Sequence, residues 1–126
     1  MTISALVVDD EENIVRMFSE LLKDVYKINV VGVAKNGKDA VEQFKKLRPD
    51  ITFLDVKMPE FDGYYALKEI RQIDESALIV LITGDVIEDV KKIPGPKPSA
   101  VINKPYNVPT LMNVLKNELK LDLNSD

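Results

Sequence analysis

The chain has 126 residues, a length that suits one domain with a hydrophobic core of its own. A net charge of −4 and the lack of a basic stripe argue against direct nucleic-acid binding, and the absence of cysteine and histidine excludes disulfides, thiolate or imidazole metal sites and a phosphohistidine carrier. No apolar run approaches the roughly 20 residues of a membrane span, and residues 1–4 lack the basic start of a signal peptide, so we expect a cytoplasmic protein without membrane contact.

Five short apolar runs, rich in β-branched residues, alternate with helical patterns along the chain. Runs of this kind are typical of strands that are buried on both faces of a parallel sheet. We therefore predict five strands, at residues 5–8, 28–34, 51–54, 78–82 and 100–102.

Amphipathic segments follow the strands, and their apolar residues recur with the spacing of one helix face. We predict that these stripes face the core: Ile14, Phe18, Leu21, Leu22 and Val25 in the first helix, Val41, Phe44 and Leu47 in the second, Leu67, Ile70 and Ile73 in the third, and Leu111, Val114, Leu115 and Leu119 in the last. Asn36-Gly37 and Asp62-Gly63 mark the starts of the second and third helices. The fourth helix, within residues 85–93, is the weakest because the proline-rich segment 94–98 ends it abruptly.

The alternation of strands and helices predicts a single doubly wound α/β domain, (βα)5, with a parallel sheet, right-handed crossovers and helices on both faces. We place the domain at residues 1–121 and expect the tail at residues 122–126 to fray. In sheets of this type, ligands bind beyond the carboxyl ends of the strands. Functional side chains are therefore expected just after each strand.

Chemically active side chains stand at four of these strand ends. Asp9 and Asp10 follow the first strand and Asp55 ends the third, while Thr83 ends the fourth and Lys104 follows the fifth. Taken singly, each residue also suits an ordinary structural role at a helix start, in a turn or in a solvated loop. A parallel sheet brings these ends to one edge, so together they predict a site with three carboxylates, a hydroxyl and an ammonium.

The clustered carboxylates call for a cation, because two carboxylates about 4 Å apart repel by roughly 4 kcal/mol at an effective dielectric constant of 20. Mg²⁺ prefers oxygen ligands, Mn²⁺ can substitute for it, and Zn²⁺ is disfavoured without cysteine or histidine. An ionised aspartate beside Mg²⁺ suits phosphoryl transfer, since Asp55 is a nucleophile at neutral pH without a general base. Lys104 would offset charge on the phosphoryl oxygens, and Thr83 would donate a hydrogen bond to one of them.

The motifs around these residues resemble those of the response-regulator receiver domain, the CheY-like family. The resemblance lies in the acidic pair within residues 7–11, the segment 55–63 with its Met-Pro and Asp-Gly, the hydroxyl of Thr83 and the Lys104-Pro105 pair, all in the family's order. It covers nearly the whole chain. It implies a five-stranded sheet in the flavodoxin-like order 2-1-3-4-5.

The resemblance also implies roles for single residues. Asp55 would form an aspartyl phosphate, taking the group from a phosphohistidine on a sensor histidine kinase or a histidine phosphotransfer protein. Asp10 and Asp55 would bind Mg²⁺ directly. Asp9 would hold the ion largely through water, and the backbone carbonyl of Lys57 would be a further ligand. The protein would then be a signalling switch that catalyses only its own phosphorylation and dephosphorylation, and the Lys104-Pro105 bond would be cis.

Two charged side chains flank the expected entrance to Asp55: Lys57, which follows it by two residues, and Asp85, which follows Thr83 by two. In the family that the chain resembles, these positions tune the lifetime of the phosphoryl group. Because their charges are opposite here, we hypothesise that they pair across the mouth of the site and slow the entry of attacking water. The alternative is two separately solvated charges, worth about 0–1 kcal/mol.

The chain departs from the family in its later part. Val101 stands three residues before Lys104, where the family usually has a Tyr or Phe that acts as a rotameric switch, and the segment between Thr83 and Lys104 carries three prolines. The fourth helix, fifth strand and fifth helix form the family's usual output surface. We expect a downstream protein target to bind there without the usual aromatic–threonine coupling, and we expect Tyr106 to pack mainly against the core.

Two other function classes stay open. A pseudo-receiver, a protein-interaction module that signals without phosphate, is favoured by Val101 and disfavoured by the complete acidic pocket. A cofactor protein or enzyme on the same fold is disfavoured more strongly. The acids at residues 9–12 would repel the phosphate of a flavodoxin cofactor, and Lys57 stands where a haloacid-dehalogenase-type phosphatase has its second aspartate.

Overall fold

The computed structural model describes residues 2–121. Within this range, parallel strands form one sheet in the order β2-β1-β3-β4-β5, which confirms the predicted doubly wound architecture and strand order. The strands are β1 (Ile3–Val8), β2 (Ile28–Ala34), β3 (Ile51–Asp55), β4 (Leu78–Thr83) and β5 (Ala100–Asn103). Each predicted strand is present, and the tail at residues 122–126 lies outside the described residues.

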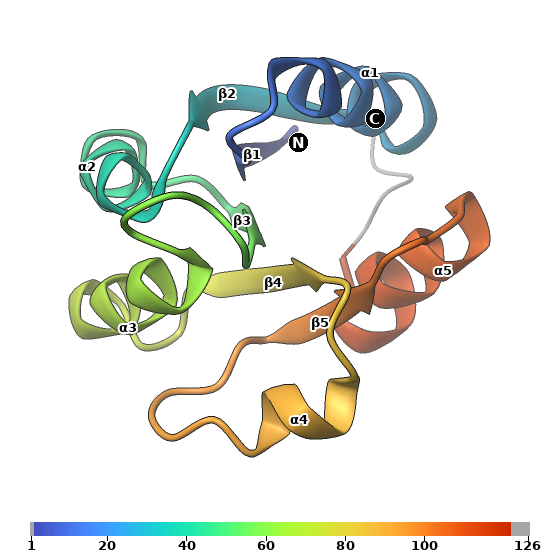
Figure 1. Ribbon diagram of the computed structural model, residues 1–126. Helices are drawn as coiled ribbons and strands as arrows, with labels where there is room; N and C mark the ends of the chain where they lie inside the picture. The colour runs from blue at the N-terminus through green and yellow to red at the C-terminus, as the bar shows by residue number, and fades with distance from the viewer. Residues whose placement is uncertain (1, 122–126) are drawn as a thin grey trace.

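Helices cover both faces of the sheet (Figure 1). The helices are α1 (Glu12–Tyr26), α2 (Gly37–Leu47), α3 (Gly63–Ile73), α4 (Ile87–Lys91) and α5 (Val108–Met112), and the π-helix η1 (Asn113–Glu118) directly continues α5. Buried residues of α1, α5 and η1 share one apolar cluster with one face of the sheet. Buried residues of α2, α3 and α4 share a second cluster with the other face.

The two clusters follow from the alternation of side chains along each strand. On β3, Phe53 faces α1 and Leu54 faces the opposite layer. The Phe53 ring meets Phe18 of α1 edge to face, with ring centroids 5.0 Å apart. Because β1, β3 and β4 are covered on both faces, their last residues are held firmly at the edge of the sheet where the candidate site lies.

The start of α3 is pressed against the end of β3. Asp62 caps this helix by accepting a hydrogen bond from the Tyr65 amide at 3.0 Å, as its position before Gly63 predicted. A Cβ atom on Gly63 would lie 2.6 Å from the Asp55 carbonyl oxygen and 2.9 Å from the Val56 Cα. Only glycine permits this approach, so the Asp-Gly pair fixes the backbone around Asp55.

Two burial predictions are wrong. Ile14 and Val25, assigned to the core stripe of α1, are 39% and 45% exposed, because the helix turns the neighbouring positions 15, 18, 22 and 26 towards the sheet. β2 was predicted to be buried on both faces, but Val31 and Val33 are exposed. The reason is topological, since β2 is an edge strand with β1 as its neighbour.

The predicted helical stripes are otherwise core, although not always fully. Val41 and Phe44 on α2, Leu67 and Ile70 on α3, and Leu111 are buried. The weak fourth helix is shorter than the 85–93 window that we predicted, with only five residues. The last helix changes to π geometry after Met112, a change that its regular apolar spacing did not indicate.

Candidate functional site

Three aspartates converge at the carboxyl edge of the sheet. Asp9 and Asp10 follow β1 and Asp55 ends β3, and each offers a carboxylate oxygen within 4.8 Å of the others. Asp9 and Asp55 are buried, whereas Asp10 is exposed. The structure thus brings together the three acids that were predicted to lie at one edge. They lie close together because β1 and β3 are neighbouring parallel strands.

The acidic cluster is strained electrostatically. Burial raises the pKa of Asp9 above its usual value, and the charges of Asp55 and Asp10 act in the same direction. The Glu11 amide, which donates to Asp9 Oδ1 at 3.0 Å, and the charge of Lys104 oppose this rise. A set of carboxylate oxygens this close together fits a hard divalent cation such as Mg²⁺, which prefers oxygen ligands.

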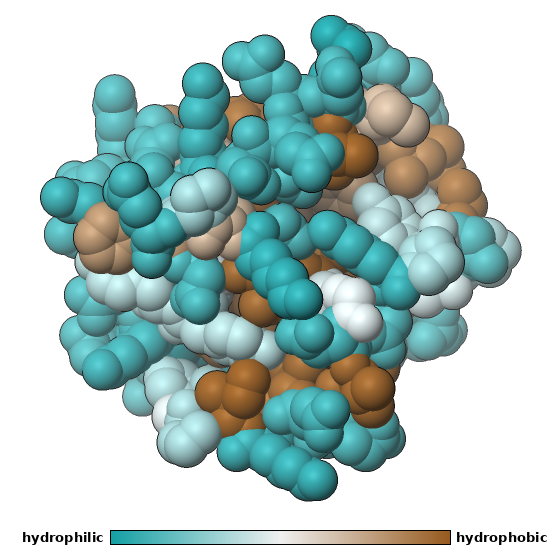
Figure 2. Space-filling model, viewed as in Figure 1, coloured by the Kyte–Doolittle hydropathy of each residue, from teal (hydrophilic) through white to brown (hydrophobic). Residues whose placement is uncertain are grey.

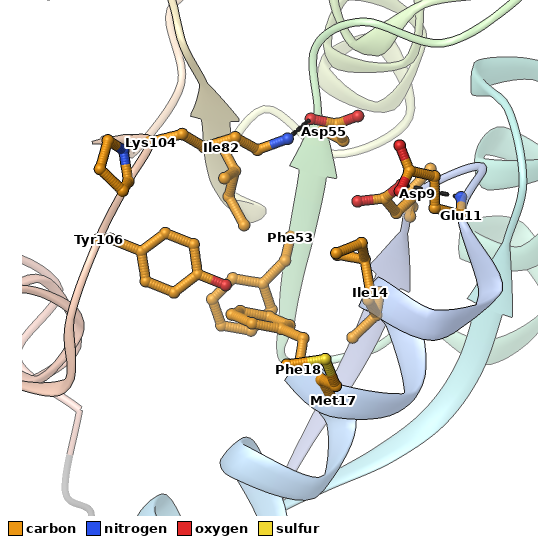
Figure 3. Close-up of a pocket in the computed structure, with 13 residues that line it drawn as sticks. Asp9, Glu11, Ile14, Met17, Phe18, Phe53, Asp55, Ile82, Lys104 and Tyr106 are labelled. Carbon is orange, nitrogen blue, oxygen red and sulfur yellow. Dashed lines mark hydrogen bonds and ion pairs between the residues drawn. The ribbon is translucent and has the colours of Figure 1, made fainter.

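Lys104 supplies the positive charge of the site. Its Nζ donates to Asp55 Oδ1 at 2.7 Å (Figure 3). Burial by itself lowers the pKa of Lys104, but the hydrogen bond and the attraction of Asp55 outweigh it, so the pKa is raised and the ammonium stays charged. The Lys104-Pro105 peptide bond is cis, as the resemblance implied.

Thr83 ends β4 beside the phosphoacceptor candidate. In the β3–β4 register Asp55 lies opposite Ile82, one residue before Thr83. The Thr83 hydroxyl is buried, and its oxygen accepts a hydrogen bond from the Asp85 amide at 2.9 Å. That bond uses a lone pair of the oxygen, so the hydroxyl proton remains available for another acceptor.

The hypothesised ion pair at the entrance is formed. Lys57 Nζ lies 3.7 Å from Asp85 Oδ1, with side chains 80% and 42% exposed. The pair joins the β3–α3 loop to the β4–α4 turn. At this exposure its contribution to stability is about 0–1 kcal/mol, so its interest lies in its position near Asp55.

Val101 and Tyr106, in and after β5, pack against opposite core clusters. Val101 is half-buried and packs against the cluster shared with α2, α3 and α4. Tyr106 packs against the opposite cluster and meets Phe18 edge to face, with ring centroids 6.0 Å apart. Burial, and to a lesser degree the charge of Asp9, raises the pKa of Tyr106 to about 12.

An apolar cavity of about 660 Å³ opens beside the acidic cluster. Ile14, Met17 and Phe18 of α1 line one side of it, and Tyr106 lines the other (Figure 3). This cavity was not predicted from the sequence, because Ile14 was expected to point into the core. Asn103, which donates a hydrogen bond to the Thr83 carbonyl, was also missed, because an asparagine at a strand end has no distinctive pattern.

The comparison with known proteins agrees with this geometry. A family model for the response regulator receiver domain matches residues 5–116. The chain belongs to the response regulator receiver family. The family acts in two-component signalling. Among residues 2–121, none of the helices has the length and hydrophobicity of a membrane span.

Two similar proteins illustrate the range of the family. The chemotaxis protein CheY of Halobacterium salinarum is 32% identical over 120 residues, which cover 94% of this chain and 98% of that protein. A protein-glutamate methylesterase/protein-glutamine glutaminase of Methanosarcina acetivorans is 44% identical over 91 residues, which cover 71% of this receiver but only 26% of the relative. The receiver thus spans between 18% and 26% of the length of these methylesterase relatives.

Among solved structures, a CheX–CheY–BeF3–Mg complex from Borrelia burgdorferi contains a chain that superposes with a TM-score of 0.79 and 26% identity. The match covers 89% of this receiver and 88% of that chain.

Proposed function

We propose that this receiver is a phosphorylation switch in which Asp55 accepts a phosphoryl group from a phosphohistidine. The observation that supports this most directly is the 2.7 Å contact between Lys104 Nζ and Asp55 Oδ1 at an edge where three carboxylates converge. An ammonium and a divalent cation on either side of one carboxylate form the electrostatic setting that phosphoryl transfer needs.

The carboxylates and a main-chain oxygen suit Mg²⁺, with Mn²⁺ as a substitute. Four groups would hold the ion: the carboxylates of Asp9, Asp10 and Asp55 and the main-chain carbonyl of Lys57. When bound, Mg²⁺ would supply positive charge that offsets the repulsion between the carboxylates and the incoming phosphoryl oxygens. Burial and, to a lesser degree, the charges of Asp55 and Asp10 raise the pKa of Asp9, and a bound cation would offset this cost of its ionised form.

The residues of the chain perform the transfer as follows. One oxygen of the Asp55 carboxylate attacks phosphorus and forms a P–O bond, while the P–N bond to the donor imidazole breaks and its electron pair stays on the nitrogen. The Lys104 ammonium offsets the negative charge of the phosphoryl oxygens. The buried Thr83 hydroxyl donates its proton to one of these oxygens, since its bond from the Asp85 amide uses only a lone pair.

The donor in this proposal is another molecule, because the chain has no histidine. A sensor histidine kinase or a histidine phosphotransfer protein would carry the phosphohistidine, in the cytoplasm. The response would pass to a downstream protein through the surface formed by α4, β5 and α5. An added phosphoryl group brings about −1.5 to −2 charges to the edge of the sheet. This charge attracts the Thr83 hydroxyl and the Lys104 ammonium, and so changes the preferred conformation of the loops that carry them.

A second candidate function is a pseudo-receiver that binds its partner without phosphorylation. The observation in its favour is Val101, which is half-buried against the α2–α3 layer and has no ring that could move between two positions. Only the phosphorylation switch requires the acidic cluster and the lysine contact together. The two candidates differ in one measurable product, an aspartyl phosphate.

Incubation with acetyl phosphate and Mg²⁺, followed by intact-mass measurement, tests the proposal. We expect one added phosphoryl group on the parent protein and none on Asp55→Asn. Asp24→Asn, which changes an exposed aspartate on α1, is the matched control and should be phosphorylated like the parent. An unmodified parent would exclude the switch in favour of the pseudo-receiver, and a modified Asp55→Asn would move the phosphoacceptor elsewhere.

A further inference from the structure

The turn between β4 and α4 has little support of its own. A Cβ atom on Gly84 would meet nothing within 4 Å, so no side chain packs against this side of the residue. Val86, the residue before α4, is exposed and makes no side-chain cap for the helix. The turn nevertheless carries groups that face the candidate site, so something else must hold it.

Asn103, the last residue of β5, reaches across to this turn. Its side-chain Nδ2 donates to the Thr83 carbonyl at 3.2 Å and to the Asp85 carbonyl. The next backbone amide, that of Lys104, also donates to the Thr83 carbonyl, at 2.8 Å. Asn103 and Lys104 therefore anchor the turn together, while the ammonium of Lys104 contacts Asp55.

The orientation of the Asn103 amide follows from its partners. Both groups that it meets are carbonyl oxygens, which accept hydrogen bonds, so only the NH₂ side of the amide can face them. An aspartate of the same shape would set an acceptor against two acceptors. A leucine of similar size would fill the space and make neither bond.

The tethered turn controls two groups of the site at once. The Asp85 amide donates to the Thr83 hydroxyl, and the Asp85 carboxylate pairs with Lys57. If the turn moves, the hydroxyl loses a fixed direction and the ion pair loses one partner. The tether thus links the position of β5 to the groups that surround Asp55.

We propose that Asn103 is a positioning residue for phosphoryl transfer, because its amide holds the Thr83–Asp85 turn in register with Lys104. This inference rests on the proposed phosphorylation of Asp55. Asn103 itself does not touch the reacting atoms. It acts through Thr83, and this gives it a signature that a residue important only for stability would lack.

The tether is tested first without any phosphodonor. Amide hydrogen exchange of the parent and Asn103→Leu is compared at Asp85, whose N–H bonds the Thr83 hydroxyl. We expect protection at this amide to fall by about fivefold, the equivalent of one net hydrogen bond. Protection unchanged at Asp85 would show that the amide does not hold the turn, and would overturn the inference.

The role in transfer is tested by the rate of phosphorylation with acetyl phosphate and Mg²⁺. We expect Asn103→Leu to react about five- to tenfold more slowly, Asn103→Asp at least as slowly, and Asn29→Leu, an exposed asparagine of β2, at the parent rate. In the Thr83→Ala background, Asn103→Leu should cause little further loss, because the two residues act through one hydroxyl.

Two results would overturn the role in transfer. One is a parent-like rate for Asn103→Leu, and the other is a full additional loss in the Thr83→Ala background. Urea unfolding of each variant separates these results from a loss of folded protein. A parent that acetyl phosphate does not modify would refute the proposed function and the role in transfer together, whereas reduced protection at Asp85 would still establish the tether.

Discussion

The layer of α2 and α3 and the segment after β4 are built differently. α2 and α3 have eleven residues each, and Asn36 and Asp62 cap their N-termini with side-chain hydrogen bonds. α4 has only five residues and begins without a side-chain cap, whereas α5 is capped by Asn107 and continues directly into η1. Asp55 therefore stands before a long, capped helix, and Thr83 stands before a short helix that has no side-chain cap.

This difference indicates which segment would change conformation after a change at Asp55. Segments with few buried contacts open locally at a lower free energy than the core does. Apolar side chains gather at the surface over α4, in the lower part of Figure 2. Val86, the residue before α4, is exposed. We therefore expect a change at Asp55 to leave α2 and α3 in place and to alter the segment of α4.

The largest predicted effect compares two glycines, one in each region. Gly63→Ala would set a Cβ atom 2.6 Å from the Asp55 carbonyl oxygen, and backbone atoms at this end of β3 have no room to move. We expect it to lower the free energy of unfolding by about 3 kcal/mol, measured by urea denaturation. Gly84→Ala, whose Cβ would meet nothing within 4 Å, should be neutral or stabilising by up to about 1 kcal/mol. Equal losses at both positions would mean that the two regions are packed alike.

A second prediction compares two buried valines. Val41 on α2 and Val90 on α4 are 7% and 4% exposed, so truncation to alanine removes similar apolar surface from each. Val41→Ala should lower the free energy of global unfolding by about 1.5 kcal/mol. Val90→Ala should lower it less, because α4 opens locally before the protein unfolds.

Amide hydrogen exchange separates these two effects. In Val90→Ala, faster exchange should be confined to residues 87–91, whereas in Val41→Ala it should extend over α2 and the strands that α2 covers. If Val90→Ala accelerated exchange throughout the sheet, α4 would belong to the same cooperative unit as the core. The contrast between the regions would then be one of length alone.

The sequence predicted the first region better than the second, for a physical reason. Long helices and central strands bury many residues with a regular spacing, so strands, caps and the acids at the strand ends could all be placed from the pattern. For a residue on an edge strand, or at the border of a helix face, neighbours that are distant in sequence decide whether it is buried. This is why Val31 of β2 and Ile14 of α1 were expected inside and are exposed.

Hydrogen bonds from a single side chain to distant backbone groups were also difficult to predict from the sequence. The Asn103 tether joins β5 to a turn about twenty residues earlier, and no periodicity marks such a bond. The Lys57–Asp85 pair could be anticipated because both residues stand at fixed distances from recognisable motif residues. The structure confirms that these two charges meet, while their effect on the phosphoryl group stays a prediction.

A third prediction concerns the charge of Asp9, which follows β1. The raised pKa of Asp9 means that the folded state holds this proton more tightly than the unfolded state does. Without a divalent ion, stability therefore falls as the pH rises from the usual value of 3.8 through the raised pKa, and the loss persists at pH 7. Asp9→Asn should be more stable than the parent at pH 7, and this advantage should disappear below about pH 3.8.

Addition of Mg²⁺ should reverse that order. At ten times its dissociation constant, the ion stabilises the parent by about 1.4 kcal/mol, and Asp9→Asn should gain less because it lacks one carboxylate. Urea midpoints at pH 3 and pH 7, with and without Mg²⁺, provide the measurement. If Mg²⁺ did not raise the urea midpoint of the parent, the proposed site would not bind this cation.

The smallest expected effect lies where the two regions meet, at Lys57 and Asp85. Their exposed pair contributes about 0–1 kcal/mol, so neither Lys57→Ala nor Asp85→Ala should change the urea midpoint appreciably. We expect each to shorten the lifetime of the aspartyl phosphate by about two- to fivefold, because water then reaches Asp55 more easily. Intact mass followed over time after removal of acetyl phosphate measures this lifetime.

The double variant decides whether the pair acts as a unit. If pairing shields Asp55, removal of one partner already opens the entrance, so Lys57→Ala combined with Asp85→Ala should decay no faster than the faster single variant. Lys35→Ala breaks a comparable exposed pair with Glu12, 3.8 Å apart, and should leave the lifetime unchanged. Two single variants with the parent's lifetime would show that the Lys57–Asp85 pair does not shield Asp55 from water.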